Sequence, residues 1–166
     1  FFFFFESVST LGFQNGIVKY VAENDKTTLE FKKIFSTLFF TLLVVTITIS
    51  SVLYLFANYW NQVVFGNSLG YSYVFRVFAI VLPLYVASLY LVSIINGFGR
   101  FKKVIYINIW GNVIGFLVTL FFVWKWIVLG ALLAIIITPS LLFFVTLYFI
   151  SKEIYIKEAI SFAFFD

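Results

Sequence analysis

The chain has 166 residues, of which 63% are hydrophobic and 11% are charged, and its mean hydropathy is +1.10. Soluble domains carry about 25% charged residues, so this composition excludes a soluble globular fold and predicts a membrane protein. The sequence has no cysteine and no histidine, which excludes disulfide bonds, imidazole bases and Cys/His metal sites, and we expect no cofactor. Because methionine is absent even at position 1, we expect an internal fragment of a longer protein.

Residues 1–22 are predicted to be the end of a membrane helix whose beginning is missing. The segment opens with five phenylalanines and becomes polar through Asn15 and Lys19. The helix is therefore expected to leave the membrane near Tyr20, because tyrosine suits the headgroup region. Glu6 lies deeper in this segment, and an acid within a membrane is a functional candidate.

Residues 23–33 are predicted to form a hydrophilic loop with a short surface helix, and residues 34–58 the first complete membrane span. The hydroxyl groups of this span fall on one stripe at 100° per residue: Thr37, Thr41, Thr48 and Ser51. Lipid offers such groups no hydrogen bonds, so we expect the stripe to face other helices or a polar cavity. The alternative is that each hydroxyl bonds back to its own helix.

Residues 59–70 are predicted to be an uncharged connector, and residues 71–96 the second span. Pro83 interrupts one backbone hydrogen bond of this span and is expected to bend it. Arg76 lies near the outer end of the span. Its side chain either extends to the membrane surface, the more common arrangement, or faces the interior of the bundle and meets an anionic ligand.

Residues 96–103 form a basic, glycine-containing break between two long uncharged runs. Two glycines allow a tight reversal of the chain. Three cations lie within four positions, at Arg100, Lys102 and Lys103. Such a loop resists transfer across a bilayer, so we expect a helical hairpin whose connection stays in the cytoplasm.

Residues 104–123 are predicted to be the third span. One face collects small and polar residues: Asn108, Gly111, Asn112, Gly115 and Thr119. The Gly111 and Gly115 spacing is typical of close contact with a neighbouring helix, and the asparagines are expected to make interhelical hydrogen bonds.

Residues 124–126 (Trp-Lys-Trp) are predicted to form a tight outer turn, and residues 127–151 the fourth span. Pro139 lies in the middle of this span, as Pro83 does in the second, and paired proline breaks are typical of helices that flex during a transport cycle. Residues 152–166 are predicted to be an amphipathic surface segment.

Alternating passes through the membrane place most cations on one side. No acid occurs between residues 31 and 152, and the net charge is +4. One side receives nine of the eleven cations: Lys19, Lys26, Lys32, Lys33, Arg100, Lys102, Lys103, Lys152 and Lys157. Only Arg76 and Lys125 lie on the other side. This asymmetry indicates that the basic side is cytoplasmic.

The predicted fold class is therefore all-α, a polytopic membrane helix bundle with four complete transmembrane helices and the end of a preceding one. The sequence offers no nucleophile–base pair, no metal cluster and no phosphate-binding glycine loop, so we do not expect an enzyme. We expect a lipid bilayer as the surrounding partner and no nucleic acid. A transporter segment fits the polar stripes and proline breaks better than a lipid-modifying transferase or a structural scaffold does.

The order of several short motifs resembles the polysaccharide flippases of the O-antigen and lipid III (common-antigen) type, in the multidrug/oligosaccharidyl-lipid/polysaccharide exporter superfamily. The resemblance covers nearly the whole chain and is carried by these segments: Asn15–Glu23 (NGIVKYVAE), Val64–Asn67 (VFGN) before Arg76, Asn96–Phe98 (NGF) with Arg100, and the Gly111/Gly115 helix.

The resemblance implies a twelve-helix, two-lobed fold in the bacterial cytoplasmic (inner) membrane, of which this chain is most of the first lobe. It implies translocation of an undecaprenyl-diphosphate-linked oligosaccharide, and the remaining helices of the transporter are the expected protein partner. The candidate contacts for the diphosphate or the glycan are Arg76, Lys19, Arg100, Asn15, Asn108 and Asn112. The alternatives are a cation-coupled multidrug exporter of the same superfamily and a membrane scaffold that transports nothing.

Overall fold

A computed structural model describes residues 4, 7–8, 13–23, 29–66 and 70–152, and every regular element within these ranges is an α-helix. The helices follow one another along the chain as α2 (Phe13–Glu23), α3 (Leu29–Leu55), α4 (Ala57–Phe65), α5 (Ser72–Gly97) and α6 (Phe101–Ser151). The predicted all-α class is confirmed for this part of the chain.

Three of these helices are long and apolar enough to cross a membrane: α3 over Ser36–Leu55, α5 over Ser72–Gly97, and α6. A helix satisfies its own backbone hydrogen bonds, which is the condition for crossing hydrocarbon. The chain is therefore a membrane protein with transmembrane helices.

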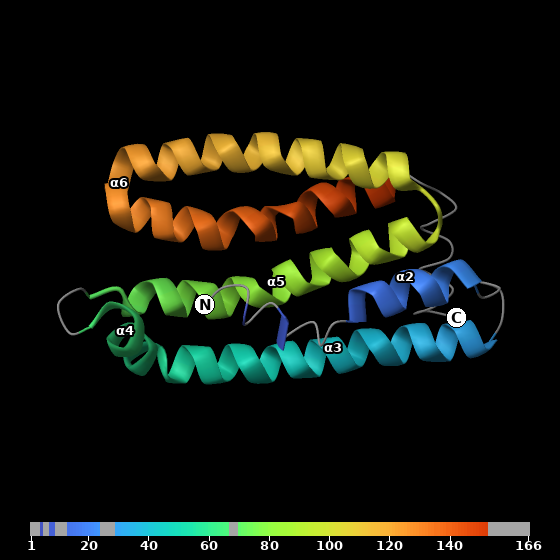
Figure 1. The fold of residues 1–166 in the computed structure, drawn as a ribbon, viewed down its shortest axis with the longest axis horizontal. Coiled ribbons are helices and arrows are strands. Elements are labelled where there is room, and N and C mark those ends of the chain that lie inside the picture. Colours follow the sequence, from blue (N-terminus) through green and yellow to red (C-terminus); the bar gives the residue numbers. More distant parts are fainter. Residues whose placement is uncertain (1–3, 5–6, 9–12, 24–28, 67–69, 153–166) are drawn as a thin grey trace.

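Helix α6 folds back on itself. It has 51 residues, and the backbone at Ile127 is not helical (φ 47°, ψ −109°). Figure 1 shows the two halves lying side by side in opposite directions; residues 101–126 are called the first limb and residues 128–151 the second limb. A Cβ atom built on Gly130 would overlap the carbonyl oxygen of Phe122, a backbone atom, so the reversal needs glycine there. The predicted outer turn at residues 124–126 is found one residue later.

The Gly111/Gly115 contact predicted from the sequence is confirmed between the two limbs. Both glycines are buried. An added Cβ at Gly111 would meet the end of the Leu142 side chain, and one at Gly115 would meet the methyl group of Thr138. The limbs thus pack closely at the two glycines, as in other close helix pairs in membranes, and a larger residue there would require Leu142 or Thr138 to move.

Helix α5 lies between α3 and the second limb of α6 (Figure 1). Near its first half, Leu53 of α3 packs with Phe78 and Leu82 of α5, and Ile136 of α6 lies against the same cluster. Near its second half, Ile95 packs with Ile107 and Ile150 of α6. The core therefore follows α5 along its whole length.

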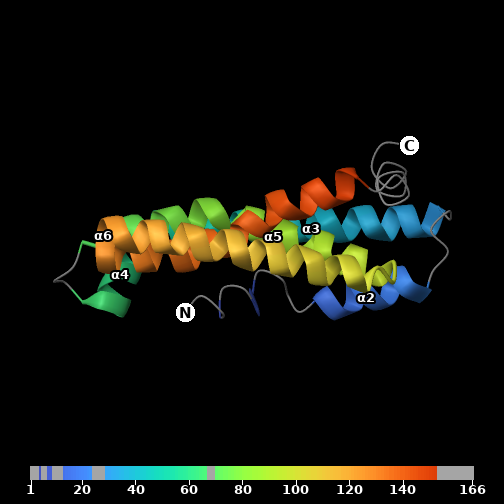
Figure 2. The same ribbon diagram turned by 90° about the horizontal axis from the view of Figure 1, so that it is seen from above.

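Helix α2 packs against the C-terminal half of α5. Ile17 and Val21 are buried with Tyr90 and Ile94 of α5. A Cβ on Gly97 would lie 2.6 Å from the Val21 Cβ atom, so this contact is also close. Figure 2 shows α2 at the same end of the bundle as the beginning of α3.

The helix boundaries differ from the prediction at both ends of the first span. Helix α3 begins at Leu29, within the segment 23–33 that was predicted to be a loop with a short surface helix. Helix α3 ends at Leu55, and the chain bends at Phe56 (φ −97°, ψ 19°) into the short helix α4. The segment 59–70, predicted to be a connector, is thus helical as far as Phe65. The bend after α5 matches the prediction, because α5 ends at Gly97 and Gly99 takes a positive φ of 73°.

Some predictions concern residues outside the described ranges. These are the phenylalanine-rich beginning of the span predicted over residues 1–22, the role of Glu6, and the amphipathic segment predicted over residues 152–166, of which only Lys152 is described.

Candidate functional site

The described cations lie at two opposite ends of the bundle. Figure 1 places the C-terminal end of α5, the beginning of α3, both outer ends of α6 and helix α2 together at one end. The cations there are Lys19, Lys33, Arg100, Lys102, Lys103 and Lys152. Arg76, near the start of α5, and Lys125, before the reversal of α6, lie at the other end. The charge separation predicted from the sequence is confirmed by this arrangement.

The basic end carries more cations than acids in the described part of the chain. Glu23 ends α2 and Glu30 lies at the start of α3. Asn15 and Lys19 are four residues apart on α2 and both are exposed, so they share one face of that helix. Arg100 is exposed at the start of α6. The arrangement can attract an anion at the membrane surface.

Arg76 does not join the other predicted cations. Its side chain is exposed, and 21 residues of α5 separate it from Gly97, which corresponds to about 30 Å of helix. One diphosphate cannot contact Arg76 and Arg100 together in this arrangement. The six candidate residues therefore do not form one pocket.

Asn108 and Asn112 are both exposed on the first limb of α6. The glycines on the neighbouring face contact the second limb, and Thr119 approaches Thr138 with 3.4 Å between the hydroxyl oxygens. The predicted polar face is thus divided: its glycines and threonine lie between the limbs, whereas its asparagines do not. The predicted interhelical role of the asparagines is wrong for the helices that the structure describes.

The hydroxyl stripe of α3 also lies on the surface of the bundle. All four of its members are exposed: Thr37, Thr41, Thr48 and Ser51. Three of them donate to carbonyl oxygens one turn earlier, with oxygen–oxygen distances of 2.7 Å for Thr37, 2.9 Å for Thr48 and 2.8 Å for Ser51. The expectation that the stripe packs against other helices is wrong within this bundle. For these three residues the alternative, bonding within the helix, is correct.

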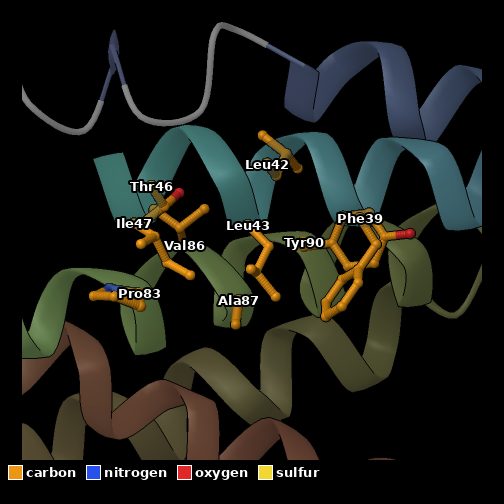
Figure 3. Close-up of a pocket in the computed structure, with 9 residues that line it drawn as sticks. All are labelled: Phe39, Leu42, Leu43, Thr46, Ile47, Pro83, Val86, Ala87 and Tyr90. Atoms are coloured by element: carbon orange, nitrogen blue, oxygen red, sulfur yellow. The ribbon is translucent and has the colours of Figure 1, made fainter. Parts of the chain in front are cut away.

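A small apolar pocket lies between α3 and α5 instead, with a volume of about 190 Å³ (Figure 3). It extends from Pro83 at one end to the rings of Phe39 and Tyr90 at the other, whose centroids are 5.4 Å apart. Thr46 lines it and is 2% exposed. The Thr46 Oγ1 atom has no hydrogen-bond partner among the described protein atoms.

Thr46 is a buried polar residue that the hydroxyl stripe did not predict. It precedes Thr48 by two residues, about 200° around the helix, and so lies on the opposite face. A second pattern in α3 identifies this face, because Leu42, Thr46, Ile49 and Leu53 are spaced by four, three and four residues, as in a packing seam. The seam, and not the stripe, contacts α5.

Comparison of the chain with family models, with curated proteins and with solved structures finds no match. The fold and the distribution of the described charges define a helical membrane protein with one basic end and an opposite end that carries Arg76 and Lys125.

Proposed function

We propose that this chain is part of the first lobe of a flippase that moves an undecaprenyl-diphosphate-linked oligosaccharide from the cytoplasmic to the periplasmic leaflet of the bacterial inner membrane. In this proposal the two limbs of α6 cross the membrane separately, so that the chain contributes four complete spans. A second lobe, outside this chain, faces the exposed side of α3.

The observation that carries the proposal is the basic end of the bundle, where exposed Lys19 and Arg100 lie at the same end. A diphosphate has several anionic oxygens, and charge-assisted hydrogen bonds to lysine and arginine are about twice as strong as neutral ones. A cationic drug would be repelled by the same surface. Asn15, one turn from Lys19, is placed to bond a sugar close to the diphosphate.

The exposed hydroxyl stripe of α3 supports a glycan as cargo. A threonine that donates its proton to its own helix still has free acceptor lone pairs. Thr48 and Ser51 are in this state and remain exposed. Sugar hydroxyls can donate to these oxygens. Asn108 and Asn112 are likewise exposed, and we assign them the same role at a later stage of the path.

Arg76 is assigned a separate step. Because it lies about 30 Å along α5 from the basic end, it cannot help to load the substrate at the cytoplasmic surface. We propose that it receives the diphosphate near the periplasmic leaflet. Loading by Lys19 and Arg100 and release past Arg76 are then distinct events.

The test is complementation of a strain that lacks its own flippase, using the complete gene. We expect the double variant Lys19→Ala/Arg100→Ala to reduce surface glycan at least ten-fold at equal protein levels. Lys125→Ala is the matched control, because it removes an exposed cation from the other end, and it is expected to retain export. If the complete gene restores no surface glycan but confers drug efflux, it encodes a multidrug exporter. If it restores neither activity, the scaffold alternative holds, and if the double variant exports as well as the parent, the role of the basic end is rejected.

A further inference from the structure

An open groove runs along α6 between its two limbs, away from the candidate residues considered above. Its volume is about 630 Å³, within the range of small-molecule sites. Trp110 and Ile114 line it from the first limb, and Phe144, Tyr148, Phe149 and Lys152 from the second. Three of the rings are more than half exposed: Trp110 (54%), Phe144 (58%) and Tyr148 (55%).

The groove has an apolar body and one charged end. Lys152 follows the last residue of the second limb, and its Nζ atom lies 4.4 Å from the centre of the Tyr148 ring. This cation–π contact holds the ammonium group over the groove wall. Lys152 belongs to the basic end of the bundle, which the charge distribution places at the cytoplasmic surface. The apolar rings below it therefore lie at the depth of the lipid chains.

We propose that this groove binds an anionic phospholipid of the cytoplasmic leaflet, with one acyl chain against the rings and the headgroup phosphate at Lys152. The inference is independent of the proposed flippase function.

The length of the groove agrees with one leaflet. From Lys152 to Phe144 the second limb advances eight residues, or about 12 Å. Half of a hydrocarbon core of about 30 Å is about 15 Å. An acyl chain anchored at Lys152 thus covers the rings from the headgroup to near the midplane. Tyrosine and tryptophan also suit the region near the headgroups.

The charge at the end of the groove favours a lipid over a protein helix as the occupant. An apolar helix that covered the rings would also cover Lys152 and leave its charge without a partner, which is costly. A phospholipid supplies the hydrocarbon and the phosphate in one molecule. Juxtamembrane cations attract anionic lipids by an amount that corresponds to roughly five-fold in affinity for each lysine.

The fluorescence of a tryptophan in the groove can report the binding of a lipid there. Trp110 lines it, whereas the other tryptophans of the chain are Trp60, Trp124 and Trp126. In the full-length protein, with every other tryptophan replaced by phenylalanine, Trp110 fluorescence is measured in vesicles that contain brominated phosphatidylglycerol or brominated phosphatidylcholine. We expect the anionic lipid to quench Trp110 with roughly five-fold higher relative affinity than the zwitterionic lipid.

Variants of Lys152 test whether this lysine causes the preference for the anionic lipid. Lys152→Gln is expected to make the two lipids equal, and Lys152→Arg to keep the preference. Lys125→Gln is the matched control, because Lys125 also lies over an aromatic ring, 4.7 Å from Trp126, at the opposite end; it is expected to keep the preference.

Equal quenching in the unmodified groove, or a preference that survives Lys152→Gln, overturns the proposal. So does an absence of quenching by either lipid, which would mean that protein covers the groove, or displacement of the phospholipid by micromolar polyprenyl diphosphate, which would assign the groove to that lipid.

Discussion

Helices α3 and α5 have spans of equal mean hydropathy but very different surroundings. In the most apolar window of each, 56% of α5 is buried within the bundle and only 17% of α3. In a water-soluble protein such a difference in burial would be visible in the amino-acid composition of the two helices, because a helix face exposed to water is polar. In lipid both faces are apolar, since the solvent is as hydrophobic as the core. Hydropathy therefore identifies the spans without showing which of them lies at the centre.

The largest effect should come from removing a side chain at the centre of α5. Leu82 is fully buried between α3 and α5. Leu82→Ala is expected to reduce the free energy of unfolding by about 2–4 kcal/mol, because it leaves a cavity that close packing cannot fill. Val44→Ala on the outer face of α3, where Val44 is 61% exposed, should change it by less than about 0.5 kcal/mol. Unfolding in mixed micelles of increasing SDS content measures both, and equal losses would contradict the central position of α5.

A smaller loss of stability is expected for a substitution at the contact between α2 and α5. In Gly97→Ala the new Cβ atom would lie 2.6 Å from the Val21 Cβ atom and 3.0 Å from the Val18 carbonyl oxygen. Overpacking of this kind costs about 1–3 kcal/mol, partly offset by the better helix propensity of alanine. Gly16→Ala is the control, because its added Cβ meets nothing within 4 Å. The same SDS titration should show loss of stability for the first variant and none for the second; two neutral variants would contradict the contact.

A still smaller change in stability is expected at Thr46, on the buried face of α3. Thr46 is buried and its Oγ1 atom has no partner among the described protein atoms. Thr46→Val keeps the shape and removes the unsatisfied oxygen, so we expect stability to stay the same or rise by up to about 1 kcal/mol. A loss of more than about 1 kcal/mol in SDS unfolding would mean that the hydroxyl has a binding partner in the membrane.

The smallest change in stability is expected on the outer face of α3. Thr41→Val/Thr48→Val should leave unfolding within about 0.5 kcal/mol of the parent, because both side chains are exposed. If sugars bond to this face, glycan export should fall roughly two- to ten-fold, as expected for lost hydrogen bonds of about 0.5–1.5 kcal/mol. Unchanged export would remove this stripe from the transport path.

Much of the fold was predictable because a membrane restricts the choices. In a membrane, long uncharged runs can only be helices. The cations at residues 100–103 and at Lys125 mark the turns between successive spans, and so they predicted which helix ends lie at the same end of the bundle. The Gly111/Gly115 pair predicted a helix contact correctly, because small residues at this spacing let two helices approach closely. The bend at Phe56 was missed, since nothing in the neighbouring sequence breaks a helix.

The candidate site was harder to predict. The hydroxyl stripe of α3 was expected to face other helices or a polar cavity. The alternative holds for Thr37, Thr48 and Ser51, whose hydroxyl groups donate hydrogen bonds within the helix and so do not require burial. The face of α3 that packs against α5 is instead the row of residues that includes Leu42 and Leu53. Lys152 was counted only as a cytoplasmic charge, because its groove exists only once the limbs of α6 are folded together.

The account rests most directly on α6 crossing the membrane twice, with the basic end in the cytoplasm. This chain has no cysteine. Single cysteines at Phe101, Trp124 and Ser151, placed in the full-length protein after replacement of any cysteine elsewhere in it, can be labelled in intact cells with a membrane-impermeant maleimide. The account predicts labelling at position 124 from outside, and labelling at positions 101 and 151 only after the cells are permeabilised. Labelling of positions 101 and 151 from opposite sides would contradict it.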